Sequence, residues 1–153
     1  MRQKMIDDFG ASLKNIRLKA TPRRLAILDI LASESVYLSP EEVWQKLKAR
    51  FAKTGLPSVY RNLEALAQGG VIIQIIHPDR KLYYYHCRNG SHHHHFVCIA
   101  CRKVQDLTFC GMDEIEQEIK GALKGRVISH VLQVYGLCRE CSDDTTIANE
   151  GAA

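Results

Sequence analysis

The run of histidines and cysteines from His92 to Cys101, HHHHFVCIAC, constrains this chain more than any other stretch. Imidazole and thiolate are ligands that bind Zn²⁺ well, and paired C-x-x-C ligands are the usual structural zinc arrangement. A second pair follows downstream, and the 36 residues between the pairs have the pattern of a strand, a helix and a strand. A redox C-x-x-C pair or buried thiols are the alternatives. We expect a closed structural zinc site formed by Cys98, Cys101, Cys138 and Cys141.

The four consecutive histidines predict metal ligation on both faces of one strand. Successive side chains of an extended strand point to opposite faces. His93 and His95 therefore share one face, and His92 and His94 share the other. An internal affinity tag or a solvated polar turn is the alternative. One strand can thus supply two separate metal sites.

Residues elsewhere in the chain are candidates to complete the first of these sites. Cys87 ends a predicted strand six residues before His93. We expect a hinge site between two domains that uses Cys87, His93 and His95, although a small buried hydrophobic role for Cys87 is the alternative. Asp106 is a further carboxylate candidate.

On the other face, we expect Asp113 and His130 to join His92 and His94. Each of the two added residues has a competing role. Asp113 lies where a helix N-cap would lie, and His130 alternates with apolar residues as a core histidine does. Cys110 has no expected partner or role.

Composition and charge indicate a globular protein with a basic first half. The chain has 153 residues, 46% of them apolar and 25% charged, as in ordinary soluble proteins. Its longest apolar stretch, 71–76, is too short to span a bilayer, and its start lacks an apolar signal region. We therefore expect a cytoplasmic protein with no membrane partner. Residues 1–70 carry 12 Lys and Arg against 7 Asp and Glu, which favours nucleic-acid binding there.

The first half has the pattern of a winged helix. Helical spacing runs over 5–18, and Thr21-Pro22 and Ser39-Pro40 are strong helix starts. A fourth helix, 58–68, carries an exposed Tyr60-Arg61 pair and is followed by strands at 71–76 and 81–87. A recognition helix followed by a hairpin is typical of winged-helix DNA-binding domains. A plain helix bundle with a solvated face is the alternative.

The second half predicts a small α/β domain. Strands are expected at 94–99 and 103–108, a helix at 113–123 and a strand at 126–137. That last strand is apolar on both faces, as expected for burial on both sides or at a subunit interface. The expected fold class is α+β: a winged-helix DNA-binding domain, then a small α/β dimerisation domain with a Cys₄ zinc site. The expected boundaries are 1–87 for the first domain, 88–91 for a hinge, 92–141 for the second domain and 142–153 for a flexible tail.

Four motifs resemble the ferric-uptake regulator family of metal-dependent repressors. They are TPRR (21–24), SVYRNL (58–63), HHHHFVCIAC (92–101) and SHVLQVYGLCREC (129–141), in the family's order and spacing. The stretches KLYYYHC and CIACRKVQDLTFCGMD are most similar to the zinc-uptake branch, whose hinge cysteine matches Cys87. The resemblance matches His93 and His95 to the hinge histidines. It also matches the set His92, His94, Asp113 and His130 to a second regulatory site.

Two departures bear on the hinge site. Iron- and peroxide-type members commonly take a hinge histidine from a position that is Tyr37 here, and the zinc type often adds a ligand where Ile73 stands. The fourth hinge ligand is therefore open, and the candidates are His77, His86 and Asp106.

The resemblance implies a zinc-responsive repressor that binds a pseudo-palindromic operator in double-stranded DNA as a homodimer. It places Tyr60 and Arg61 near bases, and Lys19, Thr21 and Arg23 near phosphates or the groove. An iron- or peroxide-responsive member, with Fe²⁺ or Mn²⁺ as regulatory metal, is the first alternative, and a zinc storage or chaperone protein is the second. A zinc deaminase is disfavoured because the H-x-E…P-C-x-x-C pattern is absent, and no enzyme activity is expected.

Overall fold

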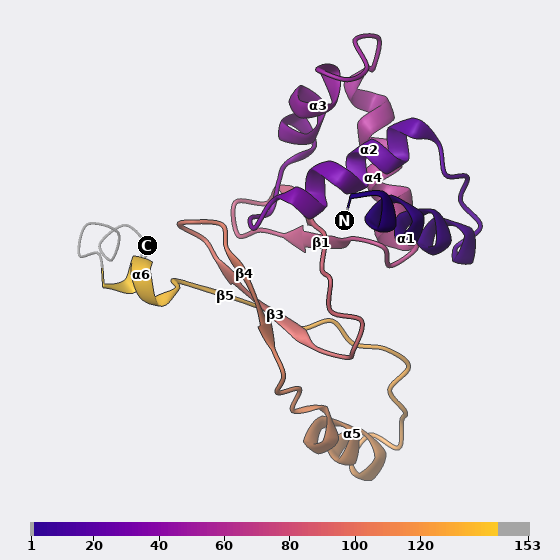
Figure 1. The fold of residues 1–153 in the computed structure, drawn as a ribbon. Helices are drawn as coiled ribbons and strands as arrows, with labels where there is room; N and C mark the ends of the chain where they lie inside the picture. Colours follow the sequence, from indigo (N-terminus) through magenta and orange to yellow (C-terminus); the bar gives the residue numbers. More distant parts are fainter. Residues whose placement is uncertain (1, 144–153) are drawn as a thin grey trace. The chain divides into compact units, whose positions relative to one another are not determined.

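The chain divides into two compact units, and the boundary along the sequence lies between Arg88 and Asn89 (Figure 1). The structure is a computed structural model and describes residues 2–143, with only the backbone described for residues 2–7. The expected α+β class is confirmed. None of the helices described within residues 2–143 combines the length and apolarity needed to cross a membrane.

The first unit consists of four helices and a two-stranded antiparallel hairpin. The helices are α1 (Arg2–Asn15), α2 (Pro22–Ser33), α3 (Pro40–Lys48) and α4 (Leu56–Gln68), and the strands are β1 (Ile73–Ile76) and β2 (Leu82–Tyr85). The segment before α3 pairs with the hairpin through Leu38, whose backbone N–H donates to the Tyr84 carbonyl at 2.9 Å. This order of helices followed by a wing hairpin is a winged helix.

Local capping fixes where the helices of the first unit begin. The Thr21 hydroxyl accepts from the Arg24 backbone N–H at 3.3 Å, ahead of a proline at the first position of α2. Ser39 and Glu42 form the expected capping box of α3. These contacts satisfy backbone donors that a helix start leaves unpaired.

One apolar core holds these helices and the wing together. Val59, Leu63 and Leu66 lie on one face of α4 and are fully buried. They join buried aliphatic side chains of α2 and α3 and the ring of Tyr84 from β2. Burial of this face leaves the opposite face of α4 to solvent.

The second unit contains a three-stranded sheet of order β4-β3-β5. Its strands are β3 (His94–Cys98), β4 (Val104–Leu107) and β5 (Gln133–Gly136), and its helices are α5 (Met112–Gly121) and α6 (Arg139–Ser142). β3 is central, antiparallel to β4 and parallel to β5. The flexible tail was expected at 142–153. Its first residue, Ser142, is the last residue of α6, and residues 144–153 lie outside the described residues.

The strand expected at 126–137 is shorter in the structure, and this part of the prediction was wrong. Only Gln133–Gly136 pairs with β3, where its partners are His95 to Cys98. The residues before β5 expose apolar side chains, with Ile128 at 77% and Val131 at 88% exposure. The apolar residues of 126–137 do alternate in the sequence. A β-strand also requires a neighbouring strand whose backbone N–H and C=O groups are available for pairing.

Candidate metal centres and nucleic-acid interface

The four expected structural cysteines lie together at one end of the sheet. Cys98 ends β3, Cys138 caps α6 and Cys141 lies within α6, and the four Sγ atoms are within 4.8 Å of one another. The Sγ atoms of Cys101 and Cys138 are 3.6 Å apart. Ligands bound tetrahedrally at about 2.3 Å are separated by roughly 3.8 Å, so the four thiols fit one zinc ion.

Backbone donors prepare Cys98 for metal binding. Burial would raise the pKa of the Cys98 thiol, but backbone hydrogen bonds from Cys101, Cys138 and Ala100 outweigh it and lower the pKa to about 6. The Cys138 N–H donates to the Cys98 Sγ at 3.3 Å. Since the thiolate is the metal-binding form, these donors favour the liganded state.

On one face of β3 the structure brings together His93, His95 and Asp106. The Nε2 atoms of His93 and His95 are 2.9 Å apart, and the Asp106 Oδ1 lies 3.7 Å from the first and 4.0 Å from the second. Asp106 faces His95 across the β3–β4 ladder. Of the three candidates for the fourth hinge ligand, Asp106 is therefore the one that the second unit places beside these histidines.

Neighbouring groups orient these side chains. The Nδ1 of His93 lies 2.6 Å from the Ser91 carbonyl oxygen, so an N–H at Nδ1 would donate to that carbonyl and the Nε2 lone pair would face His95. The Asn89 amide donates to Asp106 Oδ2 at 3.0 Å. Such outer contacts fix ring tautomers and carboxylate positions in metal sites.

The two other fourth-ligand candidates pack within the first unit. His77 lies in the wing turn, where its Nδ1 is 3.0 Å from Asp79 Oδ1 and its ring packs against Tyr83. The ring of His86 packs edge-on against Phe9 at 5.3 Å, and burial lowers its pKa. Cys87 is the last residue but one of this unit, and it is half-buried.

On the other face of β3 the structure differs from the expectation. His92, His94 and His130 come together as expected, but the fourth member is Cys110, and Asp113 does not belong to the cluster. The positive φ of Gly111, 64°, ends the turn before α5 and carries Asp113 into the first turn of that helix. The sequence pattern gave Cys110 no partner, because the turn at Gly111 is what brings Cys110 close to the three histidines.

The expected DNA-contacting residues lie on the exposed side of the winged helix. Tyr60 and Arg61 are exposed on α4, and Lys19 and Arg23 are exposed around the start of α2. The Tyr60 hydroxyl donates to Glu41 Oε1 at 2.6 Å, which raises the pKa of Tyr60 to about 12. Thr21 is occupied as the α2 cap.

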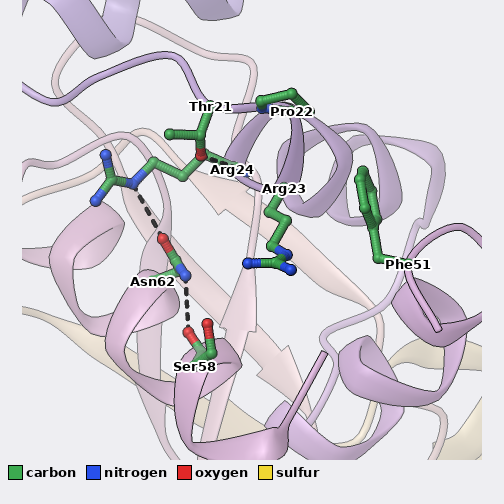
Figure 2. A pocket seen from close by; sticks show the side chains of 7 residues that line it. All are labelled: Thr21, Pro22, Arg23, Arg24, Phe51, Ser58 and Asn62. Atoms are coloured by element: carbon green, nitrogen blue, oxygen red, sulfur yellow. Dashed lines mark hydrogen bonds between the residues drawn. The ribbon is translucent and has the colours of Figure 1, made fainter. Parts of the chain in front are cut away.

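A hollow of about 400 Å³ lies between the beginnings of α2 and α4. Figure 2 shows the side chains that line it. Its lining includes Thr21, Arg23, Ser58 and Asn62. Sequence reasoning missed Arg24, whose Nε donates to Asn62 Oδ1 at 3.0 Å and whose Nη1 donates to the Lys19 carbonyl at 2.9 Å. Arg24 thereby ties the two helix starts together and leaves Arg23 available to a ligand.

A winged helix followed by a sheet that gathers clusters of metal ligands defines a metal-responsive DNA-binding protein. The sequence model of the ferric uptake regulator family matches residues 15–135. The chain belongs to this family of metal-responsive repressors, as the motifs predicted.

Known proteins of several kinds are similar to the chain. The peroxide operon regulator of Bacillus subtilis strain 168 is 29% identical over 131 residues, which cover 86% of this chain and 89% of that protein. The Campylobacter jejuni peroxide stress regulator has 28% identity and a TM-score of 0.58, with 84% of this chain and 96% of that chain covered. A zinc uptake regulator complexed with zinc and DNA has a TM-score of 0.75 at 20% identity, with 94% and 96% covered. At that identity the last likeness shows the fold alone.

Proposed function

We propose that the protein is a zinc-responsive transcriptional repressor that binds a pseudo-palindromic operator as a homodimer when its hinge site holds metal. The observation that carries the proposal is the donor set of this site. His93, His95 and Asp106 of the second unit supply two imidazoles and a carboxylate, and the family resemblance assigns Cys87, near the end of the first unit, as the thiol donor. A thiolate in a four-donor set favours zinc over manganese or magnesium.

The residue at Tyr37 supports zinc over iron or peroxide sensing. The family resemblance places a hinge histidine of iron- and peroxide-type members at this position. Here Tyr37 is 1% exposed, and its ring packs edge-on against Tyr83 at 4.9 Å. Ile73, where zinc-type members often add a ligand, is apolar, which leaves Asp106 as the proposed fourth donor.

The proposed ligands come from two parts of the chain, so a metal ion bound to all of them would link these parts. Cys87 follows the wing strand β2 in the first unit, whereas His95 and Asp106 lie in the sheet of the second unit and His93 directly precedes β3. A bound zinc ion supplies a four-coordinate link of fixed geometry among such donors. Changing a DNA-binding arrangement from 1:99 to 99:1 requires a preference of roughly 5.5 kcal/mol, which two hinge sites of a dimer would share.

DNA contact is assigned to the exposed side of α4 and the start of α2. Tyr60 and Arg61 would approach base edges, while Lys19 and Arg23 would contact phosphates. Thr21 would act through its cap, because its hydroxyl already accepts from the Arg24 N–H. A storage or chaperone role would leave this basic surface without a partner.

A peroxide-responsive repressor with Fe²⁺ or Mn²⁺ is the second candidate. The observation in its favour is the name of the Bacillus subtilis relative, a peroxide operon regulator. In that case a mild oxidant would abolish operator binding, and manganese would replace zinc as the activating ion.

The test is an operator-binding titration in zinc buffers for the parent and three variants. We expect Cys87→Ser and His93→Ala to require at least tenfold more free zinc, because a serine hydroxyl stays protonated and ligates weakly. His92→Ala, on the other face of β3, is the control and should respond within a few-fold of the parent. A Cys87→Ser protein that responds to zinc like the parent would remove Cys87 from the proposed hinge site. A parent activated by manganese and silenced by peroxide would support the second candidate instead.

A further inference from the structure

We infer that Cys110, and not Asp113, completes the second metal site beside His92, His94 and His130, and that its thiolate makes this site selective for zinc-class ions. This differs from the carboxylate site with Asp113 that the sequence suggested. The inference concerns a site in the second unit alone and does not rest on the zinc-responsive proposal.

The separations of the four side chains match those of ligands around a single ion. The Cys110 Sγ lies 3.0 Å from His94 Nε2 and 3.4 Å from the Nε2 atoms of both His92 and His130. The Nε2 atoms of His94 and His130 are 3.3 Å apart. A tetrahedral ion bonded at about 2.0 Å to nitrogen and about 2.3 Å to sulfur separates its ligand atoms by roughly 3.3 to 3.6 Å.

Hydrogen bonding alone does not account for this convergence. Three ring nitrogens approach one sulfur, but a thiol has one proton to donate, and sulfur is a weak acceptor. Protonating the rings would place like charges in contact, with ring centroids 4.8 to 5.1 Å apart. A shared cation satisfies all four lone pairs at once.

The local backbone explains why Cys110 takes the fourth place. Gly111 has a φ of 64°, and a Cβ there would lie 3.2 Å from the Phe109 ring. This turn precedes α5, so Cys110 faces the sheet while Asp113 is exposed on the helix. At a helix N-terminus a carboxylate is favoured by the helix dipole, which gives Asp113 a role without metal.

The burial of His130 is a second argument for a metal ion that holds the segment between α5 and β5. His130 lies in this segment, where Ile128 and Val131 are largely exposed. His130 is half-buried because it turns toward His94 and Cys110. The site would therefore fasten this segment to the central strand.

The ligand chemistry sets the class of ion. One thiolate and three imidazoles suit Zn²⁺ and its spectroscopic substitute Co²⁺, whereas Mn²⁺ and Mg²⁺ prefer oxygen donors. Replacing the Asp113 carboxylate with the Cys110 thiolate thus moves this site away from the metals that carboxylate-rich sites accept.

The experiment measures alkylation of Cys110 in the full-length protein, read on its own peptide by mass spectrometry so that the other five cysteines do not interfere. Iodoacetamide is applied to metal-depleted protein and to the same protein with Zn²⁺ or Mn²⁺ added. We expect Zn²⁺ to slow the modification of Cys110 at least tenfold and Mn²⁺ to leave it unchanged. His92→Ala and His130→Ala should abolish the protection, and Asp113→Asn, the matched control, should keep it.

Zinc content and cobalt spectra give an independent reading. Cys110→Ser should bind one zinc per protomer fewer than the parent, and its Co²⁺ spectrum should lose part of the sulfur-to-cobalt absorption. Two results would overturn the inference: no zinc protection of Cys110 in the parent, or protection that Asp113→Asn removes and His130→Ala spares. Neither result depends on operator binding, so failure here is distinct from failure of the zinc-responsive proposal.

Discussion

At the scale of single residues, the proposed DNA-binding surface contains a preformed contact between two helices. The Tyr60 hydroxyl on α4 donates to Glu41, which lies in the first turn of α3. That position suits a carboxylate, because the helix dipole stabilises negative charge there. The hydrogen bond lowers the pKa of Glu41 and raises that of Tyr60 to about 12. Tyr60 is thus oriented before any ligand arrives.

We predict that Glu41→Gln lowers the pKa of Tyr60 from about 12 toward its ordinary value of 10, because the charged acceptor is lost. NMR titration of tyrosines labelled at Cζ measures this directly. The folded-state pKa is raised, so the stabilisation is fully present below about pH 10 and is lost as pH rises through about 12. Glu64→Gln is the control, because Glu64 acts on Tyr84 instead. An unchanged Tyr60 pKa in Glu41→Gln would show that this contact is not formed in solution.

At the scale of elements, α4 has one face that packs into the core and an opposite face to which DNA contact is proposed. Its apolar face is fully buried, whereas Arg61 on the opposite face is exposed. A substitution at Arg61 therefore removes a charged group without opening a cavity. Changes in DNA binding can then be attributed to the contact itself and not to unfolding.

We predict that Arg61→Ala weakens binding to the specific operator by about 1–3 kcal/mol while binding to unrelated DNA changes less. The reason is that an arginine bonded to a base edge carries sequence information, whereas a phosphate contact does not. Competition binding at fixed salt measures both affinities. Lys120→Ala removes the same charge from α5 and serves as the control. Equal losses on specific and unrelated DNA would reassign Arg61 to phosphate contact.

The elements also show what sequence can predict. Helix caps such as Thr21 and Ser39 depend on residues fewer than four positions away, so they could be predicted. The alternation of side chains along a strand likewise predicts that His93 and His95 lie on the same face. The pairing of Cys110 with His130 spans 20 residues and depends on the turn at Gly111. Likewise, only four residues of the apolar stretch 126–137 pair with β3, and the apolar pattern alone does not show where this pairing begins. Long-range features of this kind were the ones predicted incorrectly.

At the scale of the whole molecule, the two units are stabilised by different means. The first has a continuous apolar core that includes side chains of α1, α2, α3 and α4. In the described part of the second unit, helix α5 has no buried residue, and the cluster around Cys98 consists largely of the cysteines themselves with Phe96 and Leu137. We therefore expect the second unit to gain much of its stability from a metal held by the four cysteines, because metal binding and folding are coupled in small domains with little apolar burial.

This difference predicts that Cys98→Ser destabilises the second unit selectively. Cys98 is fully buried at the end of β3, and loss of its thiolate opens a closed four-sulfur site. We expect the free energy of unfolding of the second unit to fall by more than about 4 kcal/mol, with loss of one tightly held zinc and of the dimer. Hydrogen exchange resolved by segment should show lost protection in β3 and β5 and unchanged protection in α2 and α4.

Cys87→Ser is the matched control for Cys98→Ser, because it removes a thiol from the chain without touching the four-cysteine cluster. It should keep the tightly held zinc, the dimer and the protection of β3. The two variants therefore distinguish the expected structural site from the proposed regulatory site. A Cys98→Ser protein that stays dimeric, retains its zinc and protects β3 as the parent does would show that the apolar contacts of the second unit suffice, and that the four cysteines are not its structural metal centre.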